Sequence, residues 1–167
     1  MYKEFCLLLG FVSRLPIRIR WDSKEEDWGR SFRLLPLWGL VLGTMIASVL
    51  AIFSLVSIPV AAVCGVGFCV LITGGLHLDG LMDVADGLGS CQDREKTFAI
   101  MKDSLVGSMG VTAAVILLLS KFALYWQLIA DWRIFWVLPA ALVFSRWLVA
   151  WAIFTFPAAR PTGLGAT

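Results

Sequence analysis

Long uninterrupted runs of apolar residues dominate the chain and predict helices that cross a membrane. No charged side chain occurs between Leu34 and Leu78, although about 20 apolar residues are enough for one helical crossing. This run therefore predicts two crossings. We place the break near Pro59, because proline starts a helix well and interrupts one badly. The expected spans are 34–57 and 59–77.

Two later apolar runs predict further spans at 110–129 and 134–156, and each contains a basic residue, Lys121 and Arg146 respectively. A charge inside a bilayer is costly and by default indicates function, which makes Arg146 a candidate substrate-binding residue. The alternative for Arg146 is an ordinary position near a shifted span end. Lys121 is expected to extend its amine towards the membrane surface.

A shorter apolar run at residues 5–12 is too short to cross a bilayer and ends at Ser13 and Arg14. Its basic start is weak and no small-residue cleavage site follows, so a signal peptide is disfavoured. We expect an interfacial or re-entrant helix instead. The arginines that it places at the lipid headgroups are Arg14, Arg18 and Arg20.

The acidic stretch "DSKEEDW" at 22–28 predicts a short helix outside the membrane. Asp22 or Ser23 caps its start, and the acidic side chains of the first turn suit the positive end of the helix dipole. We interpret this segment as an ordinary solvated helix.

Composition supports a membrane protein and excludes several other classes. Of the 167 residues, 59% are hydrophobic and 16% charged, and the mean hydropathy is +0.84. The fold class predicted is an all-α, polytopic transmembrane bundle of about four spans, with residues 1–167 forming one integral membrane domain. A net charge of +2 gives no reason to expect a nucleic-acid partner. The four cysteines form no CxxC pair, so neither a disulfide nor a zinc site is predicted.

The distribution of basic residues predicts the orientation. Seven precede the first span, three lie in the 79–109 loop and one lies in the tail, whereas the opposite side receives only Arg133. Positive loops stay in the cytoplasm. We therefore expect a multi-pass protein of the cytoplasmic (inner) membrane whose 79–109 loop faces the cytoplasm.

That loop begins with the candidate chemistry, three aspartates in "GGLHLDGLMDVADG". On a helix, Asp79, Asp83 and Asp86 fall at about 0°, 40° and 340° at 100° per residue, which is one narrow stripe. Like charges so spaced repel one another, and a cation would relieve the repulsion. Mg²⁺ suits carboxylates combined with substrate phosphates, so all three are candidate metal-binding and catalytic residues. The alternative is a solvated helix face.

Basic residues downstream suggest what the metal would hold. The stretch "DREKTFAIMKDSLVGSMG" at 93–110 contains Arg94, Lys102 and Asp103, which are candidate substrate-binding residues. Cations that face a metal held by carboxylates form an electrostatic clamp for phosphoryl transfer. The residues thus predict a magnesium-dependent membrane transferase acting on a diphosphate-linked substrate. For Lys102, a membrane-surface anchor is an equal alternative.

The motifs "TGGLHLDGLMDVADGL" and "IMKDSLVGSMG" resemble the cobalamin synthases, the membrane family of adenosylcobinamide-GDP ribazoletransferases, as do "FVSRLPI", "RSFRLLPLWGLVLG" and "PAARPTGLG". The resemblance implies a Mg²⁺-dependent reaction that joins adenosylcobinamide-GDP to α-ribazole, or to its 5′-phosphate, and releases GMP. This is a late step of cobalamin biosynthesis that completes the corrinoid.

By motif, the resemblance assigns metal or diphosphate binding to the three aspartates, with Lys102 and Asp103 as partners. It adds Arg160 as a phosphate-binding residue and His77 as a motif residue that acts as general base or serves orientation or packing. One departure is Leu105, where a polar or basic residue is expected. Family members also continue past "GLG" with further spans, so we expect this chain to match the N-terminal part of a longer family fold.

Two rival functions remain from the residues. A CDP-alcohol phosphotransferase also places aspartates in a helix stripe beside glycines and would release CMP. An ion transporter would need its acids near mid-membrane, whereas these lie at a predicted interface. A homo-oligomer is compatible with the sequence.

Overall fold

The computed structural model describes residues 2–17 and 25–157, and all regular structure in these ranges is helical. The helices are α1 (Tyr2–Val12), α2 (Glu25–Phe32), α3 (Leu35–Ser54), α4 (Ile58–Thr73), α5 (Leu76–Gly89), α6 (Arg94–Ile100), α7 (Ser108–Ala130) and α8 (Ile134–Thr155). The predicted all-α membrane fold is confirmed.

Three helices, α3, α7 and α8, are long and apolar enough to cross a membrane, and α4 with α5 counts as a fourth candidate in two pieces. The expected crossing at 59–77 is wrong at its C-terminal end. The helix stops at Thr73, and α5 leaves at 88° to α4. The physical reason is the pair Gly74 and Gly75, whose φ angles of 61° and 74° lie in the left-handed region that ends helices.

Close packing of α3 against α8 forms the most intimate pair in the bundle. A Cβ on Gly39 would collide with the carbonyl oxygen of Leu142, and one on Gly43 would come within 2.6 Å of the Pro139 Cα. Two glycines four residues apart let helix backbones approach closely in a membrane. The buried side chains of Leu42 and other α3 residues continue this contact into the core.

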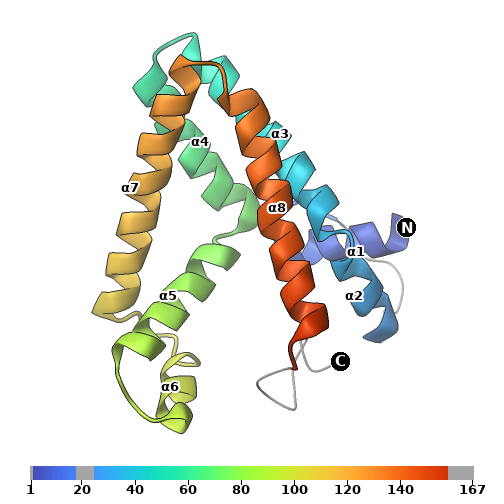
Figure 1. The fold of residues 1–167 in the computed structure, drawn as a ribbon, viewed down its shortest axis with the longest axis vertical. Helices are drawn as coiled ribbons and strands as arrows, with labels where there is room; N and C mark the ends of the chain where they lie inside the picture. Colours follow the sequence, from blue (N-terminus) through green and yellow to red (C-terminus); the bar gives the residue numbers. More distant parts are fainter. Residues whose placement is uncertain (1, 18–24, 158–167) are drawn as a thin grey trace.

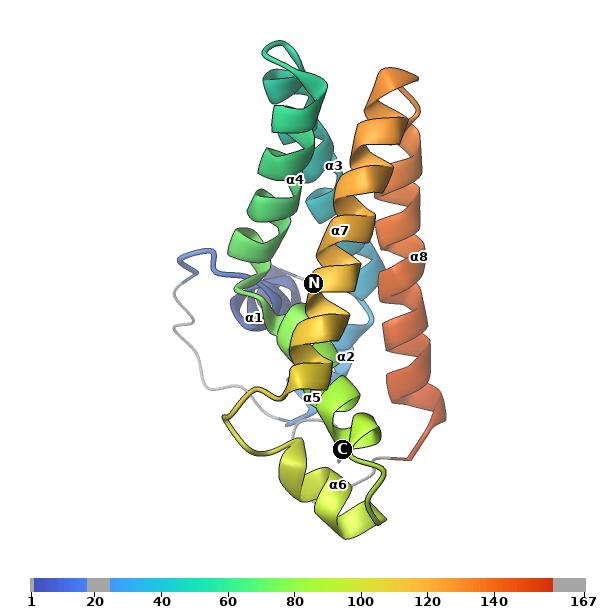
Figure 2. The same ribbon diagram turned by 90° about the vertical axis from the view of Figure 1, so that its left-hand side faces the viewer.

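Figure 1 shows α7 and α8 meeting near one end of the molecule and diverging towards the other, with α4 between them. From the end of α4, α5 runs towards α6 at the far end of the molecule. Along the way, α5 packs against α7. Figure 2 shows α3, α4, α7 and α8 running side by side. The bend between α4 and α5 therefore lies partway along the length of α8, away from the end of the molecule where α7 and α8 meet (Figure 1).

The N-terminal helix α1 lies across the direction of α3 and α8 (Figure 1) and packs against α2. Its 11 residues are too few to cross a bilayer, as the sequence predicted. The expected headgroup arginines Arg18 and Arg20, and the expected caps Asp22 and Ser23, lie outside the described residues.

Candidate functional site

The bend between α4 and α5 organises the candidate site. The amide of Gly75 donates to the carbonyl of Val70 at 3.0 Å and the amide of Gly74 donates to that of Leu71 at 3.2 Å. These bonds satisfy carbonyls that the end of α4 would otherwise leave unpaired. The Thr73 hydroxyl, itself buried, donates to the carbonyl of Cys69 at 2.8 Å. The turn is therefore a well-bonded structure in which both glycines are needed.

Arg14 packs against this turn from the N-terminal segment. Its amide donates to the carbonyl of Ile72 at 2.8 Å. A Cβ on Gly74 would collide with the Arg14 Nε and lie 2.9 Å from its Cγ. The missing side chain at Gly74 thus makes room for the arginine, and the backbone bond fixes where Arg14 enters.

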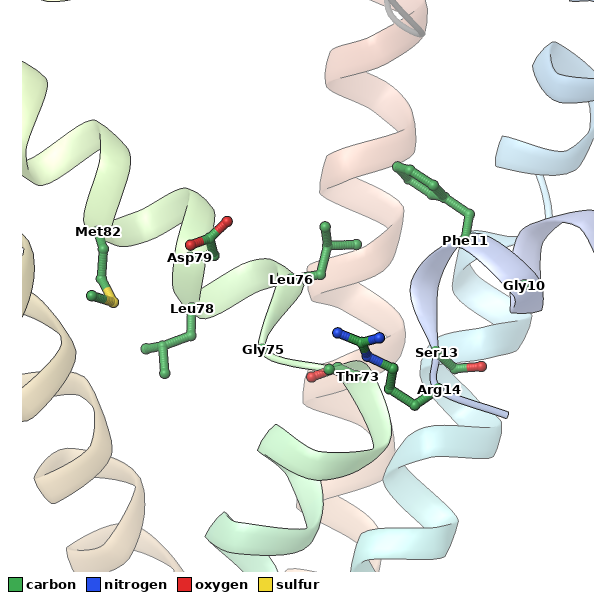
Figure 3. A pocket seen from close by; sticks show the side chains of 11 residues that line it. Gly10, Phe11, Ser13, Arg14, Thr73, Gly75, Leu76, Leu78, Asp79 and Met82 are labelled. Carbon is green, nitrogen blue, oxygen red and sulfur yellow. The ribbon is translucent and has the colours of Figure 1, made fainter. Parts of the chain in front are cut away.

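A cavity of about 550 Å³ opens between α1, the turn and α5, and both Arg14 and Asp79 line it. Figure 3 shows the Arg14 guanidinium beside the turn and the Asp79 carboxylate farther along α5. The complete lining is Gly10, Phe11, Ser13, Arg14, Thr73, Gly74, Gly75, Leu76, Leu78, Asp79 and Met82. Small-molecule sites typically measure about 300–1,000 Å³, so this cavity has the size of a ligand site.

The carboxylates of Asp79 and Asp83 make no hydrogen bond or ion pair with any described residue. Asp79 is exposed and Asp83 is half-buried. They lie one helical turn apart on α5, so their negative charges repel each other and a cation between them would relieve the repulsion. Two carboxylates free of protein partners suit a hard cation that keeps several waters.

Asp86, by contrast, already has two partners from α7. Its Oδ2 accepts the amide of Gly107 at 2.8 Å and its Oδ1 accepts the amide of Gly110 at 2.7 Å. Gly107 is the N-cap of α7 and has no side chain to cap the helix. Asp86, which lies on α5, therefore caps the N-terminus of α7 in place of a local N-cap side chain. A Cβ on either glycine would collide with the Asp86 carboxylate, which explains both glycines.

Within the described residues, no group of three His, Cys, Asp or Glu side chains is arranged to hold a metal ion. The three predicted ligands are divided instead, because Asp79 lines the large cavity while Asp86 binds α7 and lines a different hollow. The metal assignment of all three aspartates stays a prediction. The free carboxylates of Asp79 and Asp83 fit such an ion better than Asp86 does.

The predicted residues of the 93–110 stretch lie away from Asp79. Asp103 shares with Asp86 a hollow of about 280 Å³ at the α5–α7 junction, and its Oδ1 accepts the amide of Leu105 at 3.0 Å. Lys102 is exposed. The Arg94 guanidinium lies 5.6 Å from the ring centre of Phe98. None of these residues lines the 550 Å³ cavity, and Arg160 lies outside the described residues.

His77 and Arg146 meet on the other side of the bend, in a small cavity of about 60 Å³ that Lys121 also lines. Arg146 is buried, as a charge inside the bundle rather than at a span end. His77 does not line the cavity of Asp79. The role of Arg146 in substrate binding stays a prediction, and Lys121, which was expected to extend its amine towards the membrane surface, lines this inner cavity instead.

Arg14 is the site residue that sequence reasoning missed, because the basic pattern 14–20 was assigned to lipid headgroups. The motif "FVSRLPI" contains Arg14. Its contacts with the turn, a hydrogen bond to Ile72 and packing against Gly74, are visible only in the folded structure. No periodicity connects segments so far apart in the chain.

Comparison with known proteins decides the family. The model of the family described as cobalamin-5-phosphate synthase matches residues 4–167. The chain belongs to this family. The resemblance drawn from the aspartate motif is therefore confirmed, and the Arg14–Asp79 cavity lies within the matched region.

Several curated relatives carry the name adenosylcobinamide-GDP ribazoletransferase. That of Geotalea daltonii is 38% identical over 148 residues, covering 87% of this chain and 60% of the relative. That of Klebsiella pneumoniae is 36% identical over 169 residues, covering 99% and 69%. That of Brevibacillus brevis is 47% identical over 122 residues, covering 70% and 48%. The chain thus spans about half to two thirds of the length of these relatives. No solved structure matches it.

Proposed function

We propose that this chain carries the site of a magnesium-dependent transferase that joins adenosylcobinamide-GDP to α-ribazole, or to its 5′-phosphate, and releases GMP at the cytoplasmic face of the inner membrane. The observation that supports it most is the 550 Å³ cavity at the helix bend, where Arg14 and Asp79 face one space. An arginine and a carboxylate suit the two halves of a metal-bound diphosphate. Relatives named for this reaction supply the substrates.

Asp79 and Asp83 are the residues that would hold the metal, because their oxygens have no protein partner among the described residues. A bound Mg²⁺ would supply charge stabilisation to the phosphoryl oxygens. Asp86 would hold α7 against α5 and so keep the two free carboxylates in position. A rigid support of this kind is what precise metal sites require.

Arg14 would bind non-bridging oxygens of the diphosphate. Its planar guanidinium donates two parallel hydrogen bonds to a phosphate, and its place against Gly74 limits its freedom. In the reaction, a ribose hydroxyl oxygen forms a bond to the phosphorus that carries the cobinamide. The bond from that phosphorus to the oxygen of GMP breaks, GMP departs with the bonding electrons, and the hydroxyl proton passes to a base.

His77 remains a candidate for that base, but its position favours the alternative, a role in orientation or packing. It lines the small cavity behind the bend and a second, apolar cavity of about 200 Å³ with Val149 and Ile153. A general base has to come within hydrogen-bond reach of the proton that it removes. His77→Gln would lower kcat steeply if it were the base and mildly if it only orients α5.

The test is GMP release from adenosylcobinamide-GDP and α-ribazole by the purified protein, with Mg²⁺ titrated. We expect turnover that requires the metal and is lost in Asp79→Asn and Asp83→Asn. The matched control is Glu95→Gln, an exposed carboxylate on α6 that lines neither hollow. Full turnover in Asp83→Asn at unchanged expression would refute the metal assignment.

The same geometry would also suit a CDP-alcohol phosphotransferase, because one arginine and one free carboxylate in a cavity suit any metal-bound diphosphate. The two activities differ in the mononucleotide that leaves. Offering both nucleotide substrates and identifying the product separates them, and CMP without GMP would replace the proposed function with this alternative.

A further inference from the structure

Behind the bend lies a second cavity that the proposed reaction does not use. It measures about 60 Å³ and lies where α4, α5, α7 and α8 meet. Its polar lining is Cys69, Thr73, His77, Lys121 and Arg146, and no carboxylate lines it. Two cationic side chains therefore share this small cavity without an acidic partner in its lining.

Arg146 is the more deeply buried of the two cations. Only 7% of it is exposed, and its Nε atom is buried with no hydrogen-bond partner in the described structure. The single hydrogen bond found for its guanidinium is a long one of 3.4 Å from Nη1 to the Ser145 hydroxyl, its chain neighbour. A buried guanidinium with five donors normally has several acceptors, so this site lacks acceptors.

Lys121 approaches the same space from α7. Its Nζ donates to the Cys69 Sγ at 3.9 Å, and a thiol is a weak acceptor. No ion pair joins Lys121 or Arg146 to any described carboxylate. Both amphipathic side chains thus direct their charge inwards at this cavity rather than towards the ends of their helices.

The cavity is also far from the helix ends. Lys121 follows the α7 start at Ser108 by 13 residues, about 20 Å along the axis, and Arg146 precedes the α8 end at Thr155 by 9 residues, about 14 Å. A charge at such depth is costly unless a counter-charge accompanies it. An anion bound in the cavity would supply that counter-charge.

We propose that this cavity is a binding site for one phosphate-type oxyanion, held between Lys121 and Arg146, with the Thr73–Gly75 turn beside it. A cavity of about 60 Å³ exceeds the 10–15 Å³ that one water needs, which leaves room for a single tetrahedral group and not for a nucleotide. Arginine supplies two parallel donors and lysine a point charge, the usual combination for phosphate.

The site adjoins the larger cavity, because Thr73, Gly75 and Leu78 line both. An anion behind the turn would therefore fix the position of the turn that receives Arg14 and precedes α5, the helix that carries Asp79. That the anion is a phosphate of the substrate rests on the proposed function. The binding itself does not, and a lipid headgroup would offer the same phosphate chemistry.

Binding is tested on the purified chain in maltoside detergent, which contains no phosphate. We expect inorganic phosphate to raise the midpoint of thermal unfolding relative to chloride of equal ionic strength, and equilibrium dialysis to give about one phosphate per chain. In Lys121→Gln and Arg146→Gln, the rise and the bound phosphate should be lost. Arg133→Gln, whose arginine is exposed beside Asp131 at the other end of α8, is the matched control and should behave as the wild type.

A second measurement separates binding from a structural role. Without phosphate, Arg146→Met and Lys121→Met should unfold at the same temperature as the wild type or higher, because an unpaired buried charge destabilises. If phosphatidylglycerol but not inorganic phosphate stabilises the wild type and not the variants, the anion is a lipid headgroup. The proposal is overturned if neither anion stabilises the wild type, if the variants respond equally, or if the methionine variants unfold far below it. None of these readings requires turnover, so failure of the transferase assay leaves them unaffected.

Discussion

The carboxylate of Asp86 and the amide of Gly110 lie 2.7 Å apart although 24 positions separate them in the chain. Together with the bond from Gly107, this contact joins the aspartate helix α5 to the start of span α7. An aspartate that looks like one member of a metal-binding stripe in the sequence thus caps a transmembrane helix in the structure.

Replacing Asp86 should destabilise the protein more than it changes metal affinity. Asp86→Ala leaves two partly buried amides without acceptors, which costs about 1–3 kcal/mol. Asp86→Asn keeps one acceptor oxygen, so its stability should lie between those of the wild type and Asp86→Ala. The measurement is the free energy of unfolding in mixed detergent. Asp93→Ala, which removes a cap of the short exposed helix α6, is the control with a small effect, and an equal loss in both variants would contradict this role.

The glycines of the same junction should be intolerant of alanine. In Gly110→Ala the new Cβ would collide with the Asp86 carboxylate and break its hydrogen bonds to α7. The expected loss in the free energy of unfolding is about 1–3 kcal/mol. Gly67→Ala is the matched control, because Gly67 lies inside α4 with nothing within 4 Å of its added Cβ. That variant should be neutral or stabilised by up to about 1 kcal/mol. Equal stability of both variants would refute the geometry of the junction.

Adjacent glycines at the bend should respond differently to substitution. Gly74→Ala and Gly75→Ala both place alanine at a positive φ, which costs about 1–2 kcal/mol. Only the Cβ at Gly74 would also displace Arg14, since that at Gly75 meets open space. We therefore expect similar unfolding temperatures but a much higher KM for adenosylcobinamide-GDP in Gly74→Ala. The same KM in both variants would show that Arg14 does not bind the substrate.

Substitution on the α3 face tests the packing of the spans. Gly43→Leu would drive a side chain into the backbone of α8 at Pro139 and should destabilise the bundle by about 1–3 kcal/mol. Gly67→Leu, with open space around its Cβ, should leave the unfolding temperature close to the wild type. Resistance to denaturing detergent, followed by circular dichroism, measures both.

The apolar runs were sufficient to predict three spans within a few residues, because a bilayer imposes a length and a composition on each crossing. The bend was not predicted, because the uncharged run continues through Gly74 and Gly75 as far as Leu78. Their left-handed φ angles, and the packing of Arg14 against Gly74, are visible only in the structure. The stripe of aspartates was read correctly as one helical face, and what the sequence lacked was the partner of Asp86, which is a pair of backbone amides without side-chain identity.

Asp79 and Asp83, the two α5 carboxylates without a hydrogen bond or ion pair among the described residues, are the groups proposed to hold the divalent ion. Mn²⁺ binding, followed by electron paramagnetic resonance in the purified protein and displaced by Mg²⁺, measures this without any substrate. We expect Asp79→Asn and Asp83→Asn each to weaken Mn²⁺ binding by more than about tenfold, and Glu95→Gln to leave it unchanged. Wild-type affinity in both aspartate variants would contradict this assignment.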